Sequence, residues 1–514
     1  MFRDIARRNP RRPAIVHHGR TLTYHRLLET VNALATALGP TPGTVAVPAV
    51  HAPETVVALL GVLTAGGVYC PVDPAFPAAR RHAMATAAQC GAAVSAPGTD
   101  PLRLGLRLVE LPQPPEKPGN PPVHPPGTDP EQPACILFTS GSTGQPKPVL
   151  TPRRALTTTA RALGGLFGLT PGDRVLQFAS LNWDTSFEEI LPALTTGATL
   201  VLDPDAHSGS FPRFLRLLER ERITVLDLPT AFWHELVHHL VDSGDRLPDH
   251  LRLLVIGGEA AAPARLADWA RLPTGRIRLL NTYGCTETTQ ITHAVDLAGP
   301  LARGRTWDGS ARAPIGRALP HVVERLDEQG QLLIGGPSLA LGYLGLPEAT
   351  AARFTTLDGE RFFRTGDRTT RDPAGLLTHQ GRLDGELKVR GIRVDPAEVE
   401  AHLTGHPAVT AAAVTGVTTA GRTTLVAYVV ARPHPAARAA DGTPDRTPAP
   451  APQHPLDRAL LDHLRALVPG HLVPARITLV PALVHTPSGK VDRAGCHRRY
   501  AAPPDRSKET TLEH

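Results

Sequence analysis

A run of small hydroxyl residues and glycines that ends at Lys147 has the composition of a phosphate-binding loop. Glycine has no Cβ, so the backbone N–H groups of such a loop can close around an anion, and hydroxyl groups add further donors. The lysine is unusual, because the 514 residues contain only five lysines among 54 basic residues. We therefore expect a compact ammonium at this position to contact phosphate. The run consists of Thr139, Ser140, Gly141, Ser142, Thr143, Gly144, Gln145, Pro146 and Lys147.

Two other interpretations of this run are a Walker loop and a flexible linker. The Walker pattern ends in Gly-Lys-Ser/Thr at the start of a helix. Here Pro146 and Pro148 flank the lysine, so a helix cannot begin in that manner. A linker has no reason to follow the apolar, strand-like stretch at 134–138 and to end in a rare lysine. The run therefore predicts a phosphate loop of another class.

Length and composition restrict the class of protein. A chain of 514 residues exceeds one ordinary core, so at least two domains are expected. No apolar run approaches the ~20 residues of a membrane span, and the N-terminus has no apolar leader, which predicts a cytoplasmic protein without a membrane partner. The five cysteines form no CxxC pair, so neither disulfides nor zinc is indicated. The net charge of +6 is dispersed, which argues against nucleic acid.

Helix-like and strand-like segments alternate along most of the chain. This alternation predicts an α/β fold: a large N-terminal core of mostly parallel sheets with helices, a β subdomain at 311–380, and a smaller α+β C-terminal domain. The expected domains are residues 1–383, residues 384–500 and a tail at 501–514. Helices are predicted at 24–38, 54–66 and 396–403, and strands at 44–47, 174–178, 199–203, 224–228, 251–256, 278–282 and 424–430.

Several motifs occur in one order along nearly the whole chain, and together they resemble the adenylate-forming superfamily. Within it they are most similar to the amino-acid adenylation domains of nonribosomal peptide synthetases. Such a protein activates an amino acid with ATP and Mg²⁺ and loads it onto a carrier protein. The motifs are residues 63–73, 139–147, 183–186, 281–287, 364–367, 381–384, 388–391 and 488–493.

The resemblance implies roles for four catalytic residues. Forming an acyl-adenylate brings a carboxylate to the α-phosphorus of ATP, so the enzyme must neutralise and align two anions. Lys490 is expected to bridge the substrate carboxylate and the α-phosphate, and Lys147 to hold the leaving pyrophosphate. Glu287 is similar to the family's Mg²⁺ ligand, a hard carboxylate of the kind that Mg²⁺ prefers. Thr286 beside it would face phosphate.

The resemblance also implies a nucleotide site. Tyr283 would stack on adenine, with Gly258 and Glu259 in the opposite wall. Asp367 would accept the ribose hydroxyls, and Arg382 would contact the ribose and phosphate.

Asp384 matches the family's hinge between the two domains. A few residues there can absorb the φ/ψ change that swings a domain. The C-terminal domain is expected to present Lys490 for adenylation and then, after rotation, Lys388 and Gly391 for thioester formation on a phosphopantetheinylated carrier protein.

The substrate is predicted from residues carried over from the family's pocket. Asp184 matches the aspartate that pairs with an α-ammonium group, which favours an amino acid. Glu188 and Asp227 are two further acids, and a cationic side chain would neutralise them. A basic amino acid of the lysine, β-lysine, ornithine or arginine type is therefore predicted. The other interpretation is that an arginine pairs with either acid or that one points away. The pocket comprises Asp184, Thr185, Glu188, Asp227, Val255, Gly257, Thr282, Gln290, Ile291 and Lys490.

The sequence leaves two other functions to consider, an acyl-CoA synthetase and a non-catalytic scaffold, and one further binding partner. An acyl-CoA synthetase would release its product onto coenzyme A, although Asp184 argues against it, and a non-catalytic scaffold would lack Lys490 or Glu287. No carrier attachment motif follows Arg493, so a free-standing or excised adenylation enzyme is expected. The family also includes members that bind an MbtH-like protein, here expected to dock near residues 338–343.

Overall fold

The computed structural model describes residues 1–96, 98–112, 129–140, 145–302, 306–383, 386–389, 391–419, 422–432, 455–485 and 491–501. The chain divides into two compact units. The first comprises residues 1–139, 146–384 and 390–392, and the second comprises residues 140–145, 385–389 and 393–514.

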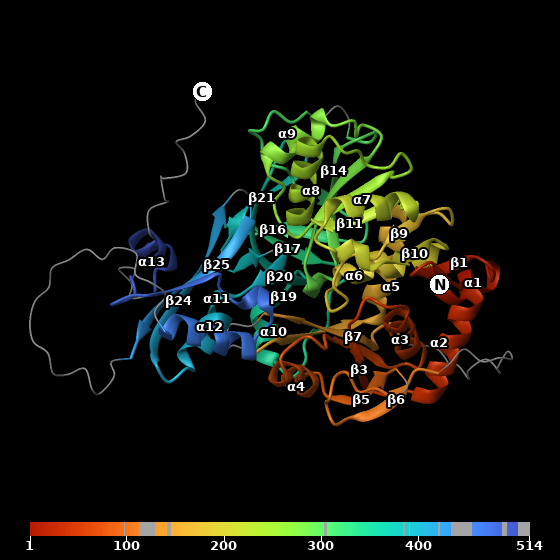
Figure 1. The fold of residues 1–514 in the computed structure, drawn as a ribbon, viewed down its shortest axis with the longest axis horizontal. Helices are drawn as coiled ribbons and strands as arrows, with labels where there is room; N and C mark the ends of the chain where they lie inside the picture. Colours follow the sequence, from red (N-terminus) through yellow and green to blue (C-terminus); the bar gives the residue numbers. More distant parts are fainter. Residues whose placement is uncertain are drawn as a thin grey trace, which may run out of the picture. The chain divides into compact units, whose positions relative to one another are not determined.

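The larger sheet of the first unit has nine strands (Figure 1). Its middle six strands are parallel, and antiparallel strands close both ends. Most of their interior residues are apolar and buried, as expected of a sheet covered on both faces, and Asp227 is a buried acid among them. In spatial order the strands are β15 (Arg317–Ala318), β14 (Ile291–Ala298), β13 (Arg278–Gly284), β12 (Leu253–Gly257), β11 (Val225–Pro229), β9 (Arg174–Leu176), β10 (Thr199–Leu202), β1 (Pro13–His17) and β2 (Arg20–Thr23).

The second large sheet has seven strands. The phosphate-loop run connects β7 to β8 as an antiparallel pair, in which Thr139 is opposite Lys147. A strand rather than a helix therefore begins at Lys147, as the flanking prolines predict. In spatial order the strands are β18 (Gly342–Tyr343), β8 (Lys147–Pro152), β7 (Pro133–Thr139), β4 (Val68–Val72), β3 (Thr44–Pro48), β5 (Cys90–Ser95) and β6 (Arg107–Glu110).

The strands of residues 134–310 are divided between these two sheets and do not form one sheet. β7 pairs instead with β4 from the N-terminal part, through Tyr69 opposite Cys135, and β8 pairs with β18 near residue 342. The elements themselves were predicted well, because alternation and period are local. Which parallel strands are neighbours depends on helices that cross between them, and this is not visible in local sequence.

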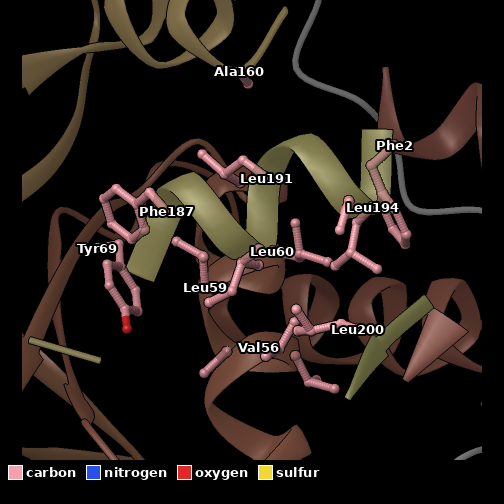
Figure 2. Close-up of a cluster of buried hydrophobic side chains, with 14 of the residues drawn as sticks. Phe2, Val56, Leu59, Leu60, Tyr69, Ala160, Phe187, Leu191, Leu194 and Leu200 are labelled. Atoms are coloured by element: carbon pink, nitrogen blue, oxygen red, sulfur yellow. The ribbon is translucent and has the colours of Figure 1, made fainter. Parts of the chain in front are cut away.

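Helix α6 (Thr185–Thr196) is the centre of the core between the two sheets (Figure 2). Its residues from Ser186 to Leu194 are all buried. Leu191 and Leu194 pack with Leu59 and Leu60 of α3, and the ring of Phe187 lies 5.9 Å from that of Tyr69. Each such side chain contributes about 1.5–3 kcal/mol on burial. Packing of the surrounding helix residues in the core therefore fixes the position of Glu188.

The other helices of the first unit cover its sheets. Most begin with Pro at the first or second position, or follow a β-region residue, which is how helices commonly start. They are α1 (Phe2–Arg8), α2 (Tyr24–Leu38), α3 (Pro53–Thr64), α4 (Ala78–Ala87), α5 (Arg153–Leu166), α7 (Phe211–Arg220), α8 (Thr230–Ser243), α9 (Pro263–Arg271) and α10 (Pro347–Arg353), with short 3₁₀ turns η1 (Pro204–His207) and η2 (Thr286–Thr288).

A five-stranded sheet confirms the predicted β subdomain. Its order is β16 (Val323–Leu326), β17 (Gln331–Gly335), β20 (Glu360–Arg371) and β19 (Phe354–Leu357), and β21 (Leu377–Arg382) pairs with β20. The register places Asp367 of β20 opposite Arg382 of β21.

The C-terminal region has its own small core. Leu403, Val414, Ala427, Leu460 and Leu464 are among the side chains buried there. No helix in the described parts of the chain is long and apolar enough to cross a membrane. The elements are β22 (Leu387–Val389), β23 (Ile392–Val394), α11 (Pro396–Thr404), β24 (Val409–Thr419), β25 (Arg422–Ala431), α12 (Pro455–Leu467), η4 (Gly470–Leu472), β26 (Arg476–Leu479) and α13 (Arg493–Tyr500).

Candidate active site

Several predicted substrate-binding residues lie on neighbouring strands of the nine-stranded sheet. Asp227 on β11 is in register with Val255 on β12, and Gly257 ends that strand. Thr282 lies near the end of β13, the next strand. The carboxyl ends of parallel strands are the usual ligand site of an open α/β sheet. The strand order thus brings residues far apart in sequence to one edge.

Two carboxyl groups form a buried pair at this site. Glu188 of α6 and Asp227 share a hydrogen bond and are only 8% and 4% exposed. Burial raises the pKa of Asp227 to about 7, and the pKa of Glu188 is raised by burial and by the Asp227 charge. Asp227 Oδ2 has no hydrogen-bond partner among the residues that the structure describes. No arginine or lysine of the described residues neutralises the pair, so the interpretation that an arginine does so is wrong for this part of the chain.

The adjacent Glu189 is held quite differently. Its Oε1 accepts hydrogen bonds from the backbone N–H groups of Phe178 and Ala179, both at 3.0 Å, and its Oε2 accepts one from Gln177 Nε2 at 3.0 Å. Burial raises the pKa of Glu189, and these three donors oppose that shift. Glu189 therefore binds the backbone that follows β9, whereas Glu188 lies against Asp227.

Asp184 lies just before α6 and accepts a hydrogen bond from the Thr286 side chain. Burial raises the pKa of Asp184, and the Thr286 hydrogen bond lowers it. The residue predicted to bind an α-ammonium is thus next to the residue predicted to face phosphate. Thr185 follows as the first residue of the helix.

Two more pocket positions have constraints that the sequence did not reveal. Thr282 Oγ1 donates a hydrogen bond to the Ile256 carbonyl at 3.0 Å. A Cβ on Gly257 would lie 2.6 Å from Thr282 Oγ1. Gln290 is 2% exposed and has a positive φ of 71°, and neither its amide oxygen nor its nitrogen has a partner among the described residues. Buried amides are nearly always hydrogen-bonded, so the described protein atoms leave the hydrogen-bonding capacity of Gln290 unused. Ile291, beside it, is buried at the start of β14.

Three of the predicted nucleotide residues, Tyr283, Asp367 and Arg382, form a hydrogen-bonded cluster. Tyr283 Oη donates to Asp367 Oδ2 at 2.6 Å, and Arg382 Nη1 donates to Asp367 Oδ1 at 2.8 Å. His379 Nε2 lies 3.1 Å from the same Oδ1. Sequence reasoning missed His379, because nothing distinguishes it from the other 22 of the chain's 23 histidines except its place three residues before Arg382.

Glu287 is 1% exposed in the 3₁₀ turn after β13, where Tyr343 Oη donates to its Oε1 at 2.7 Å. The ammonium of Lys147 lies 5.9 Å from the centre of the Tyr343 ring, a cation–π contact. Tyr343 therefore touches both groups predicted to hold metal and pyrophosphate. A carboxylate with a fixed orientation beside a phosphate loop fits Mg²⁺, which binds one or two carboxylates together with substrate phosphates.

A turn after β12 carries Gly258 and Glu259. Thr230 Oγ1 donates to the carbonyl of Gly257 at 2.9 Å and lies 3.2 Å from that of Glu259. Gly258 has a φ of 85°, a conformation that favours glycine.

Some predicted residues lie elsewhere or outside the described residues. Lys388 is on β22, and Gly391 precedes β23 with a φ of 82°. The phosphate-loop residues Gly141, Ser142, Thr143 and Gly144, the hinge residue Asp384 and the catalytic residue Lys490 fall outside the described residues.

The stretch at residues 338–343, near which an MbtH-like protein is expected to dock, is mostly buried. Ser338, Leu339, Ala340, Gly342 and Tyr343 are buried, and only Leu341 is partly exposed. Its side chains pack against β8 and Glu287. Docking of an MbtH-like protein near this stretch stays a prediction.

Comparisons with known proteins agree with this geometry. Residues 2–344 match the model of the AMP-binding enzymes, and residues 398–490 match that of the AMP-binding enzyme C-terminal domain. An isonitrile lipopeptide synthase of Streptomyces coeruleorubidus is 39% identical over 93% of this chain, which spans 32% of that protein's length. An artificially fused adenylation–PCP di-domain, NpsA-ThdA from Klebsiella oxytoca, is 26% identical, with a TM-score of 0.75 over 93% of this chain and 92% of that one. A malonyl-CoA ligase bound to methylmalonyl-CoA and AMP is 28% identical, with a TM-score of 0.74 over 92% and 97%.

Proposed function

Since the chain belongs to the family of AMP-binding enzymes, with relatives among nonribosomal peptide synthetases, we propose that it activates a basic amino acid as aminoacyl-AMP. It then transfers the aminoacyl group to the phosphopantetheine thiol of a carrier protein. The observation that carries the choice of substrate is the buried Glu188–Asp227 pair, which has no basic partner among the described residues.

The first step is attack by the substrate carboxylate oxygen on the α-phosphorus of ATP. A bond forms between that oxygen and phosphorus, and the bond to the bridging oxygen of pyrophosphate breaks. Two anions must meet, so the positive groups of the site lower the barrier by neutralising them. Lys147 contacts the departing pyrophosphate in this scheme, and Lys490 contacts the carboxylate and α-phosphate.

Asp184 orients the amino acid by accepting hydrogen bonds from its α-ammonium group. Its contact with Thr286 connects that anchor to the phosphate side of the site, so the carboxylate of the substrate is directed toward the phosphorus. Asp367 and Arg382 hold the ribose. Glu287 is the residue that would hold Mg²⁺, which when bound would supply positive charge to the phosphates.

The thioester step needs a thiol nucleophile. The carrier's thiol sulfur attacks the acyl carbon, the acyl–phosphate bond breaks, and AMP leaves. Lys388 and Gly391 are proposed to serve this step, with Asp384 as the hinge. The adenylation–carrier di-domain among the structural relatives supports a carrier as acceptor. An MbtH-like partner that docks near residues 338–343 stays a prediction.

The second candidate is an acyl-CoA synthetase, as the resemblance to a malonyl-CoA ligase suggests. Asp184 favours an amino acid instead, because a partly buried carboxylate near the acid's carbon backbone would repel a simple carboxylic acid and attract an α-ammonium. Coenzyme A and a phosphopantetheinylated carrier, offered to the same adenylate, separate the two functions.

Pyrophosphate exchange with a panel of amino acids, ATP and Mg²⁺ tests the proposal. Lysine, β-lysine, ornithine or arginine should exceed every neutral amino acid by at least about 100-fold in kcat/KM, since an unpaired buried acid pair discriminates strongly. Preference for leucine or phenylalanine would overturn the choice of substrate. Exchange with none of the panel, but with a simple carboxylic acid, would favour the second candidate.

A further inference from the structure

We infer that His293 and Glu324 form a second link between the two sheets that carry the nucleotide site, and that this link positions Tyr283 for the nucleotide base. Both are positioning residues, because they act through Tyr283 and not by contact with ATP. The inference rests on the proposed function in one respect, since it takes Tyr283 as the residue that contacts adenine.

Strand register places His293 beside Tyr283. The two residues are directly opposite each other on β14 and β13, so their side chains lie on the same face of the nine-stranded sheet. Their ring centres are 5.7 Å apart and their planes are inclined at 76°, an edge-to-face contact. His293 is completely buried, so its ring cannot turn away without displacing its neighbours. The ring of His293 therefore supports the ring of Tyr283.

Both members of this cross-strand pair contact acids of the five-stranded sheet. Tyr283 Oη donates to Asp367 of β20 at 2.6 Å, and His293 Nε2 lies 2.6 Å from Glu324 Oε2 of β16. β16 and β20 lie on either side of β17 in that sheet. Two short contacts from neighbouring positions thus join the same two sheets, and only the one through Asp367 belongs to the predicted ribose site.

Glu324 is itself held in place by a second donor. Arg371 Nη1 donates to Glu324 Oε1 at 2.8 Å, while His293 contacts the other oxygen. The hydrogen bond with His293 lowers the pKa of Glu324, and Arg371 adds to this shift against the opposing effect of burial. An ionised carboxylate can only accept, so His293 Nε2 is the donor. The contact is therefore a charge-assisted hydrogen bond, which is stronger than a neutral one.

The other ring nitrogen of His293 leads back to the main chain of Tyr283. Nδ1 lies 2.9 Å from Thr292 Oγ1, which in turn lies 3.1 Å from the carbonyl oxygen of Tyr283, within hydrogen-bond distance. Polar contacts therefore run without a break from Glu324 through His293 and Thr292 to Tyr283. Both the ring and the backbone of Tyr283 depend on where His293 is held.

Two amide substitutions test the link at His293. His293→Gln places a donor near the position of Nε2, whereas His293→Asn is too short to reach Glu324. Because a hydrogen bond to a charged group is lost, the KM for ATP should rise about tenfold in His293→Asn and less than about threefold in His293→Gln. The KM for the preferred amino acid should stay the same in both. Pyrophosphate exchange measures both constants.

Glu324→Ala breaks the same link from the partly exposed side and leaves the buried histidine in place. It should raise the KM for ATP about as much as His293→Asn does. Asp296→Asn is the matched control, because Asp296 pairs with Arg278 toward the other end of the same two strands. This control should leave the KM for ATP unchanged. Circular dichroism and denaturant midpoints verify that each variant is folded.

Two competitive inhibitors supply a readout that a merely structural defect would not move. AMP carries the base and the ribose, whereas inorganic tripolyphosphate carries neither. In His293→Asn the inhibition constant of AMP should rise with the KM for ATP, and that of tripolyphosphate should not change. A structural defect alone would lower the amount of active protein, and thus the apparent kcat, without altering either inhibition constant.

Three results would overturn the inference. The first is an equal rise in the KM for ATP in His293→Gln and His293→Asn. The second is a rise of the same size in Asp296→Asn. The third is an unchanged inhibition constant of AMP in a folded His293→Asn or Glu324→Ala protein.

Tyr283→Leu distinguishes this failure from failure of the proposed function. If loss of the Tyr283 ring leaves the KM for ATP unchanged, the proposed nucleotide site is wrong, and the inference fails with it. If Tyr283→Leu raises this KM but His293→Asn and Glu324→Ala do not, the nucleotide site stands and only the inference fails.

Discussion

Asp227 and Asp367 are both 4% exposed, yet the protein treats them in opposite ways. Asp367 has donors from Tyr283 on β13 and from Arg382 and His379 on β21. Asp227 has a second acid as its neighbour, and one of its oxygens has no partner within the described part of the chain. The nucleotide region is thus electrostatically complete before a ligand arrives, while the amino-acid region is left unsatisfied. The hydrogen bonds around Asp367 are already formed, so the ATP site is preorganised. In the proposed function, selectivity for the amino acid comes instead from Asp227, whose unpartnered oxygen a substrate side chain of matching charge can satisfy.

The largest effect is expected from removing the satisfied aspartate. Asp367→Ala leaves the buried Arg382 guanidinium without its carboxylate and should lower the free energy of unfolding by about 3–5 kcal/mol. Chemical denaturation of the ligand-free protein measures this loss. Asp227→Ala is the matched control, and an equal loss there would remove the contrast between the two regions.

A second prediction uses pH to show that Asp227 destabilises the empty protein. Its pKa is raised from 3.8 to about 7 on folding, so between these values the folded state binds more protons than the unfolded state. Stability should therefore fall as pH rises from about 4 to about 7, by up to about 4 kcal/mol from this group, and stay level above. Denaturant midpoints across pH, in the native protein and in Asp227→Asn, measure it. A pH slope that the variant retains in full would assign the effect to other groups.

Glu287 is intermediate between Asp367, which has several donors, and Asp227, which has an unpartnered oxygen. Tyr343→Phe removes the 2.7 Å hydrogen bond to this carboxylate and keeps the ring beside Lys147. A bond to a charged group is worth about 1.5–3 kcal/mol, so the Mg²⁺ concentration for half-maximal pyrophosphate exchange should change by roughly 10-fold or more. Phe354→Leu, a nearby change that leaves Glu287 alone, is the control. An unchanged Mg²⁺ requirement would separate Tyr343 from the metal site.

The smallest effect is expected from removing one donor of the complete cluster. His379→Phe takes a single hydrogen bond from Asp367 and leaves those of Tyr283 and Arg382, so about 1 kcal/mol is lost. The KM for ATP should rise about fivefold, and the KM for the amino acid should not change. A rise in the amino-acid KM instead would show that the two regions are not independent.

Sequence reasoning succeeded where structure is local. Helix α2 runs from Tyr24 to Leu38 as predicted, since Thr23 caps its start and Gly39, with a φ of 80°, ends it. The strands β11, β12 and β13 were found to within two residues, because apolar runs and turn residues bound them.

Long-range partners were not accessible in the same way. Tyr283 and Asp367 are 84 residues apart, and Tyr343 and Glu287 are 56 apart, so no spacing reveals either hydrogen bond. The motifs indicated that Glu188 belongs to the site, but not that Glu189 is held by backbone N–H groups. That distinction depends on where α6 is packed, which its neighbours in the core decide.

Gly257 has a practical consequence for redirecting such an enzyme to new amino acids. Any larger residue there would collide with Thr282 Oγ1 at 2.6 Å, and that oxygen is itself bound to the backbone of Ile256. Shortening the pocket by mutating Gly257 would therefore deform two strands before it altered the choice of substrate. Engineering effort is better directed at the side chains at positions 188, 227 and 290, where polarity can be exchanged without moving the sheet.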